Sequence, residues 1–174
     1  MLGDAGIKEL AGGISRNKSL VHLDVSSNEI SGKGAMDLFS SLGRNDTIIS
    51  LNISSHEGLH RNRIGPIGCQ HLSSLLQKNK FLALINISGN SIGNTGFGYI
   101  SEGLTNNTTL EGLNIAQNEI IGTQIVSDNM IHILTTAKLK EFDISDNKLG
   151  NQVLFHSILS NLFISSLLNN SLGA

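Results

Sequence analysis

Aromatic residues are scarce in this sequence. Its 174 residues include no Trp, one Tyr and six Phe, so aromatic residues make up 4% of a chain that is 39% hydrophobic. The length suffices for one domain with a substantial core. Because that core must be aliphatic, the composition favours many small, similar layers over one large centre built around aromatic rings.

Cysteine is also scarce, and targeting signals are missing. Cys69 is the only cysteine, which excludes an internal disulfide framework and predicts a reducing compartment. Residues 1–13 lack the charged region and apolar stretch of a signal peptide. No apolar run approaches the roughly 20 residues that a membrane-spanning helix requires. These absences predict a cytoplasmic protein without a membrane partner.

The charges are balanced and dispersed. Twelve Lys and Arg residues face fourteen Asp and Glu residues, a formal net charge of −2, and no run of basic residues occurs. Nucleic-acid binding depends on a concentrated positive surface. We therefore expect no nucleic-acid partner.

The sequence does contain an internal repeat. LVHLDVSSNEI begins at Leu20, and similar segments begin at Phe81, Leu110 and Leu139. Each fits the pattern L-x-x-L-x-L-x-x-N-x-L. A fifth copy is split, because IISLNISS at 48–55 supplies its first half and Asn62 resumes it. A weak final copy occupies residues 167–172.

The spacing of the motif asparagines measures the repeat. Successive asparagines lie 34, 28, 28 and 29 residues apart, and removing residues 56–61 from the first interval makes it 28. We therefore interpret 56–61 as an insertion loop within a single repeat domain spanning 1–174. The predicted asparagine ladder consists of Asn28, Asn62, Asn90, Asn118, Asn147 and Asn170.

The chemistry of the repeat predicts its structure. The L-x-L core is a short strand whose alternate residues, such as Leu51 and Ile53, face inward. The motif asparagine both donates and accepts hydrogen bonds, so it can satisfy backbone groups of neighbouring turns. Residues 34–42 and 68–76 have the apolar spacing of helices. Four further asparagines precede the strands, and we expect them to end helices in the left-handed conformation: Asn17, Asn45, Asn79 and Asn107.

A repeat of 28–29 residues with a strand half and a helical half resembles the ribonuclease-inhibitor class of leucine-rich repeats. That class includes sensor regions of NOD-like receptors and the Ran GTPase-activating protein. The resemblance implies an α/β fold, a curved right-handed solenoid with a parallel sheet on its concave side and helices on its convex side. The copy at 118–147 departs from the pattern because IIGTQIVSDNMIHIL lacks the second Gly of IGPIG and IGNTG.

Both ends of the sequence fall within a repeat. Residues 2–7 align with 92–97, so the strand half of that first copy is missing, and the last copy stops at Ala174. Solenoid ends usually carry polar caps. We expect a slice of a longer array, with self-association through uncapped ends as a possible alternative.

The insertion loop contains HEGLH at 56–60, which matches the H-E-x-x-H zinc-protease signature. That signature requires a helix and a third ligand. An insertion in a tight loop leaves little room for a helix, and Arg63 stands where the extended motif needs Gly. We predict no metal site and no catalytic site here. A protein-binding loop remains a candidate, formed by His56, Glu57, His60, Arg61 and Arg63.

A second candidate surface is the concave face of the predicted sheet. Its outward positions alternate with the inward ones and include Leu84 and Gly112. The polar members are His22, Asp24, Asn52, Asn86, Asn114, Glu141 and Asp143. Cys69 aligns with Ala35 of the preceding repeat, so we interpret it as a small buried packing residue and not as a nucleophile.

These observations predict a non-catalytic scaffold or recognition module that binds other proteins and needs no cofactor. Two alternatives remain open. The chain is a regulator of a small GTPase, in which Arg61 or Arg63 would act near the phosphates, or it is a structural part of a cytoskeletal or ciliary assembly.

Overall fold

The computed structural model describes residues 1–55, 58 and 60–150. His56, Glu57, Asn170 and the weak final repeat at 167–172 lie outside the described residues, so the predictions made for them stay predictions.

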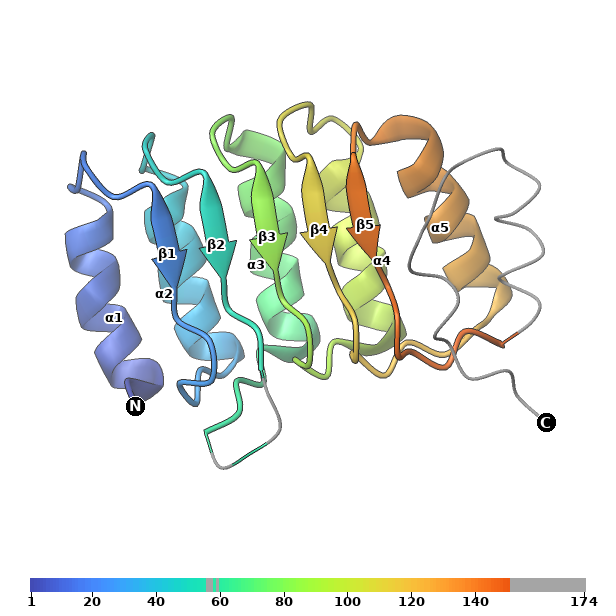
Figure 1. Ribbon diagram of the computed structural model, residues 1–174, viewed down its shortest axis with the longest axis horizontal. Coiled ribbons are helices and arrows are strands. Elements are labelled where there is room, and N and C mark those ends of the chain that lie inside the picture. Colours follow the sequence, from blue (N-terminus) through green and yellow to red (C-terminus); the bar gives the residue numbers. More distant parts are fainter. Residues whose placement is uncertain (56–57, 59, 151–174) are drawn as a thin grey trace.

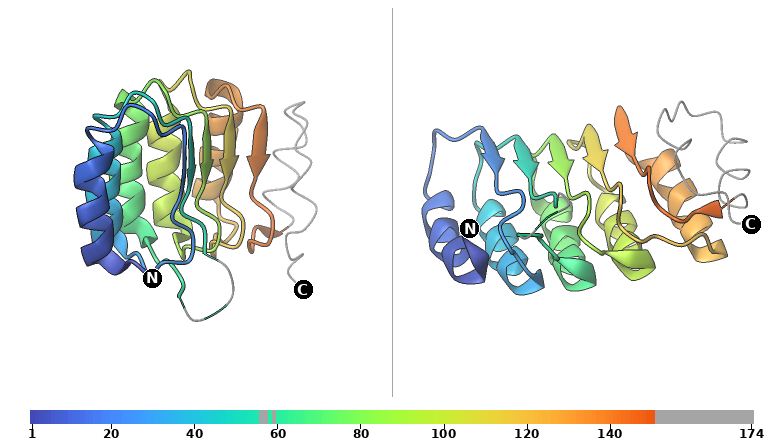
Figure 2. Two further views of the ribbon diagram at one scale, coloured as in Figure 1. Left: turned by 60° about the vertical axis from the view of Figure 1, so that its left-hand side comes forward. Right: turned by 60° about the horizontal axis from the view of Figure 1, so that its bottom comes forward.

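Five strands and five helices alternate along the described chain (Figure 1). The strands form one parallel sheet in the order β1-β2-β3-β4-β5, so every strand pairs with the strand of the next repeat. Figure 2 shows two layers, with the helices packed along one side of the sheet. The elements are α1 (Gly3–Ile14), β1 (His22–Asp24), α2 (Gly32–Leu42), β2 (Ser50–Asn52), α3 (Gly65–Lys78), β3 (Leu84–Asn86), α4 (Gly93–Leu104), β4 (Gly112–Asn114), α5 (Gln124–Thr136) and β5 (Glu141–Asp143).

The strand register follows the repeat. Leu51 of β2 pairs with Leu23 on one side and with Ile85 on the other, so like positions stack from repeat to repeat. Leu51 and Ile85 are at most 2% exposed, and they face the helices as the alternation predicts. Layers of this kind fill the space between sheet and helices with aliphatic side chains, and the prediction of an aliphatic layered core is confirmed.

The helix of the irregular repeat forms, but it begins differently. In α3 and α4 a Gly in the first turn lies close to the residue that precedes the helix. A Cβ at Gly68 would lie 2.6 Å from Ile64 Cβ. The corresponding residue of α5 is Gln124, and α5 starts there after Thr123, whose hydroxyl accepts a hydrogen bond from Val126 N at 3.3 Å. A side-chain cap thus replaces the glycine turn.

The motif asparagines bind adjacent repeats together. Asn90 is fully buried, and its Nδ2 donates to the carbonyls of Ile53, Ile87 and Ser88 at 2.9–3.1 Å. Its Oδ1 accepts from Ile64 N at 3.2 Å. One amide therefore satisfies backbone groups of two repeats.

The asparagines that precede the strands do not adopt the left-handed conformation, so that prediction was wrong. Three of them, Asn45, Asn79 and Asn107, form a second column of buried amides instead. Asn45 Nδ2 donates to Ile14 O at 2.9 Å, the last residue of α1. Its Oδ1 accepts from the backbone nitrogens of Thr47 and Ile48 at 3.0 and 2.8 Å. The positive φ angles fall elsewhere, on turn residues beside the motif asparagines such as Ser27 and Glu29.

Of the helices in the described part of the chain, none has both the length and the apolar character that crossing a membrane requires.

Candidate protein-binding surface on the sheet face

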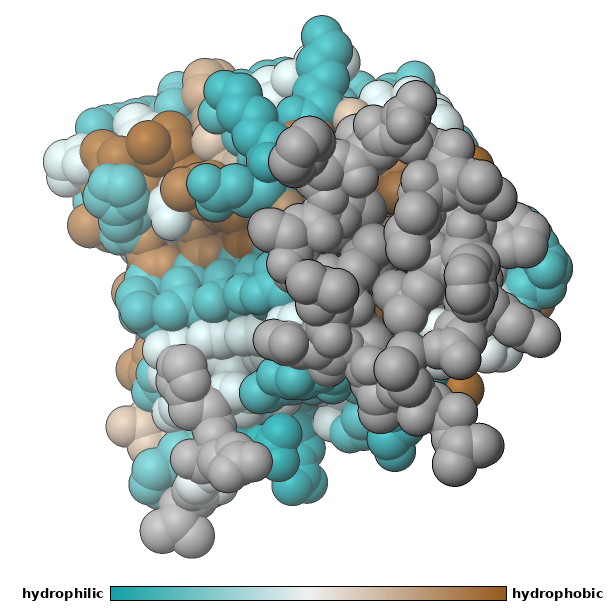
Figure 3. Space-filling model, turned by 45° about the vertical axis from the view of Figure 1, so that its right-hand side comes forward, coloured by the Kyte–Doolittle hydropathy of each residue, from teal (hydrophilic) through white to brown (hydrophobic). Residues whose placement is uncertain are grey.

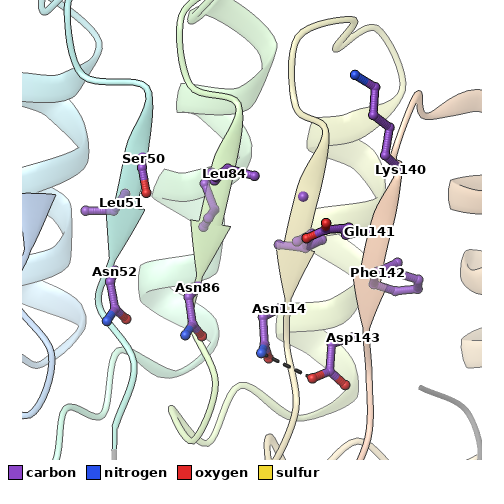
Figure 4. Close-up of a pocket in the computed structure, with 13 residues that line it drawn as sticks. Ser50, Leu51, Asn52, Leu84, Asn86, Asn114, Lys140, Glu141, Phe142 and Asp143 are labelled. Carbon is purple, nitrogen blue, oxygen red and sulfur yellow. Dashed lines mark hydrogen bonds between the residues drawn. The ribbon is translucent and has the colours of Figure 1, made fainter. Parts of the chain in front are cut away.

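The open face of the sheet carries two rows of side chains, one from each end of the short strands (Figure 4). Strand residues one and three point away from the helices because the central residue points toward them. The first row contains His22, Ser50, Leu84, Gly112 and Glu141. The second row contains Asp24, Asn52, Asn86, Asn114 and Asp143.

Hydrogen bonds fix the second row. Asn52 Nδ2 donates to Asp24 Oδ2 at 2.9 Å, and Asn114 Nδ2 donates to Asp143 Oδ2 at 3.2 Å. Each side-chain oxygen also accepts a backbone N–H two residues further along, as Asn86 Oδ1 does from Ser88 N at 3.0 Å. These local bonds hold the side chains in place before any partner arrives, so the row is a preorganised polar surface.

The first row contains a hollow. Leu84 is 44% exposed and lies over Gly112, where a Cβ would come within 2.6 Å of Leu84 Cδ2. Gly112 stands at an outward position, as predicted, but Leu84 covers it, so the expectation that it is exposed was wrong. The groove over β2–β5 has a volume of about 610 Å³, with Leu84 and Phe142 as apolar lining and Glu141 as an exposed carboxylate.

The fixed charges of the face are mostly negative. Asp24 and Glu141 are exposed, and Asp143 is half-buried. Lys140 lines the groove too, but its Nζ lies 2.8 Å from Glu111 Oε2, which offsets its charge. The face therefore offers carboxylates, amide groups and one exposed leucine.

The insertion loop lies at the opposite edge from the helix-to-strand loops (Figure 1). Gly58 and His60 occupy backbone bends and not a helix, and His60 Nδ1 lies 2.8 Å from Glu29 Oε1. Arg63 is exposed, whereas Arg61 is half-buried with its Nε enclosed. Within residues 1–55, 58 and 60–150, no group of three or more His, Cys, Asp or Glu side chains is placed to hold a metal ion.

Cys69 is a core residue, as its alignment with Ala35 predicts. It is 0% exposed, and burial raises the pKa of its thiol to about 12. A Cβ at Gly96 would lie 3.1 Å from its sulfur, so the thiol fills the space between α3 and α4. A thiol that holds its proton this strongly is a poor nucleophile.

One surface was not predicted. Val21, Ile49 and Phe81 are 41–47% exposed at the edge where the strands begin. The sequence contains a signal for it, because Leu20-Val21, Ile48-Ile49 and Phe81-Leu82 are apolar pairs. Two successive residues of an extended chain cannot both face the core.

Comparison with known proteins follows from this architecture. A family model described as Leucine Rich repeat matches residues 16–39, which include β1 and the first motif asparagine. The chain has the fold of a leucine-rich repeat protein. No curated protein matches this leucine-rich repeat chain by sequence. Its assignment to the ribonuclease-inhibitor class stays a prediction.

Solved structures with the same fold include the following two. The structure described as leiomodin-1 actin-binding site 2 has a TM-score of 0.72 at 15% identity, covering 87% of this chain and 84% of its own. The tropomodulin C-terminal domain of Caenorhabditis elegans has a TM-score of 0.70 at 12% identity, covering 88% of this chain and 90% of its own. At these identities the likeness establishes the fold of our leucine-rich repeat chain and nothing finer.

Proposed function

We propose that this leucine-rich repeat chain is a non-catalytic protein-interaction module that binds a partner through the groove on its sheet face. The observation that carries the proposal is the combination of a rigid polar row with the hollow beside Leu84. Asn52 and Asn114 are held by neighbouring carboxylates, so a partner meets groups already in position.

The chemistry of the groove indicates the partner. Its carboxylates and amide oxygens accept hydrogen bonds, and Leu84 supplies an apolar contact above Gly112. A protein segment with Lys or Arg side chains around one apolar residue satisfies both features. Asp24, Glu141 and Asp143 would meet the cations, and Leu84 would meet the apolar group.

A cytoskeletal role is the second candidate, and the structural comparison favours it. The leiomodin-1 structure is described as an actin-binding site. The similarity covers 87% of this chain, so most surfaces of this chain have a counterpart in the leiomodin-1 structure. We therefore include actin among the partners to be tested. The small-GTPase alternative has only the exposed Arg63 in its favour, and measuring GTP turnover with candidate GTPases tests it.

Affinity capture with matched variants tests the groove. The double variant Leu84→Ser/Glu141→Lys has two changes. At position 84 it carries serine, the residue at the equivalent position Ser50 of β2, and at position 141 it reverses one exposed charge. A true groove partner is retained by wild type and by Lys33→Glu, a charge reversal on α2, but is lost from the groove variant. Co-sedimentation with filamentous actin under the same comparison tests the second candidate. Equal retention of every partner by the groove variant would contradict the proposal.

A further inference from the structure

The charges of this nearly neutral chain are segregated. The loops that lead from each helix into the next strand are 15–21, 43–49, 79–83, 105–111 and 137–140, and they line one edge of the molecule, the upper one in Figure 1. Together with Lys78, the last residue of α3, these loops carry seven of the twelve Lys and Arg residues and two of the fourteen Asp and Glu residues. This edge is therefore positive although the whole chain has a net charge of −2.

Exposed apolar side chains occupy the same edge. Val21 and Ile49 are each 41% exposed and Phe81 is 47% exposed. Val21 and Ile49 lie side by side on the segments that lead into adjacent strands, since Ile49 N donates to Val21 O at 2.9 Å. Figure 3 shows hydrophobic atoms above the hydrophilic band of the sheet face, with hydrophilic atoms beyond them. We call the set Val21, Arg44, Ile49, Lys78, Lys80 and Phe81 the apolar-basic rim.

The cations of the rim are available. Lys18 is bound to Asp46 at 2.5 Å, and Lys140 is bound to Glu111 at 2.8 Å. Arg44, Lys78 and Lys80 are exposed and form no ion pair with any residue in the described part of the chain. Basic residues near helix ends also complement the helix dipole. That explanation applies to Arg44 and Lys78, but it does not account for Lys80 or for the three exposed apolar residues.

We propose that the apolar-basic rim is a docking surface for an acidic protein segment with apolar residues between its carboxylates. The charges are complementary, since Arg44, Lys78 and Lys80 have unmatched positive charge beside an apolar strip. Charge pairing orients such a segment, and burial of Val21, Ile49 and Phe81 supplies contact area.

An anionic membrane surface shares part of this chemistry, but the geometry favours a protein. Side chains that anchor a protein in a bilayer reach into the boundary of the acyl chains. Val21, Ile49 and Phe81 are more than half covered by the protein, so little of each side chain is left to enter a bilayer. A partly covered apolar strip flanked by cations suits a peptide lying along it.

The test uses the full 174-residue chain and a fluorescein-labelled peptide in which Glu and Leu residues alternate in pairs. We expect saturable binding that weakens at high salt. Lys78→Glu/Lys80→Glu should weaken binding by about tenfold or more, because two attractive contacts become repulsive. Phe81→Thr should weaken it several-fold. Threonine already occupies the equivalent positions of the adjacent repeats, Thr47 and Thr109, so the fold should persist. A melting curve verifies this.

Matched controls separate the rim from general electrostatics. Lys33→Glu reverses one charge on α2, outside the rim, and Leu84→Ser alters the groove only, so both should bind the peptide as wild type does. A partner of the groove is then lost from Leu84→Ser/Glu141→Lys but not from the rim variants, which keeps this proposal distinguishable from the proposed function. Equal binding of a peptide with Lys in place of Glu, equal loss in Lys33→Glu, or sedimentation with phosphatidylserine vesicles without peptide binding would overturn the proposal.

Discussion

Asparagine is used in three different ways, and the surroundings of each side chain decide which. Asn90 in the ladder is fully buried and bonds backbone groups of adjacent repeats. Asn45, ahead of its strand, is 3% exposed and ties one helix end to the next loop. Asn86 on the sheet face is half-buried and bonds only its own turn among the described contacts. The first two uses connect repeats, whereas the third shapes the surface.

The difference predicts unequal costs for the same substitution. Asn90→Ala should lower the free energy of unfolding by about 1–3 kcal/mol, because several buried backbone groups lose their partner. Asn86→Ala should cost less than about 0.5 kcal/mol, since water can replace its bond at the surface. Urea denaturation of both variants measures the difference. Equal midpoints would show that the ladder does not stabilise the folded state more than a surface asparagine does.

Cys69 predicts a pH dependence of stability. The folded state raises the pKa of the thiol from 9.0 to about 12, so the folded protein holds a proton that the unfolded chain releases. The stabilisation is fully present below pH 9 and is lost as the pH rises toward 12, by up to about 1.4 kcal/mol per pH unit. Cys69→Ala, with the residue found at Ala35, should lose less stability over this window. Parallel denaturation curves at pH 9 and 10.5 for the two proteins measure the effect, and identical slopes would contradict it.

At the scale of elements, each repeat has one invariant half and one adaptable half. Every strand is three residues long and keeps its register, whereas the helices begin in two ways. α4 begins at Gly93, which has the left-handed conformation at φ 59°, while α5 begins after Thr123, whose hydroxyl caps it. The strand half is constrained because an interior strand pairs with a neighbouring strand on each side. The connection to the helix can vary because it contacts only its own turn and the turn of the next repeat.

The insertion is such a variation, and it can be removed. Deleting residues 56–61 restores the 28-residue spacing and leaves Ile53 and Asn62 in the core. Among the described residues, the deletion removes the contact of His60 with Glu29 and the bond from Glu29 N to His60 O at 3.2 Å. Because these groups are exposed, the cost should stay below about 1 kcal/mol. Thermal melting measures it, with the intact chain as reference. A deletion variant that fails to fold would show that the loop is part of the structure.

For the whole molecule, the periodic features were predictable and the neighbour-dependent ones were not. The strands, their inward residues and the ladder follow from spacing alone, because every repeat obeys the same pattern. The hollow beside Leu84 depends on a leucine meeting a glycine one strand away, at 2.6 Å from where its Cβ would stand. The exposure of Phe81 depends on threonines at the equivalent positions of adjacent repeats. The left-handed turns of Ser27 and Glu29 arise from the packing of successive turns and were assigned to the wrong residues.

The stacking of repeats also explains why the first layer of the described structure is exposed. Leu20 is 40% exposed, whereas the equivalent Ile48, Leu82 and Leu110 are at most 2% exposed. The difference arises because β1 is the edge strand of the described sheet, so no described strand covers Leu20 on that side. In a solenoid, stability is approximately the sum of repeats and of the interfaces between neighbours. An uncovered layer therefore lacks one interface.

Supplying that interface should stabilise the chain. A designed repeat with a polar outer face, fused ahead of residue 1 so that its strand pairs with β1, would cover Leu20 and the half-buried Leu23. Burying two leucines contributes on the order of 1–3 kcal/mol, so the melting temperature should rise and any concentration-dependent self-association through this end should fall. Thermal unfolding and sedimentation velocity at several concentrations measure both effects. A matched fusion in which the capping strand carries Asp at its inward positions should give neither. If the uncapped protein is monomeric at every concentration and the cap changes nothing, the first layer is stable without a neighbour and the additive description fails at this end.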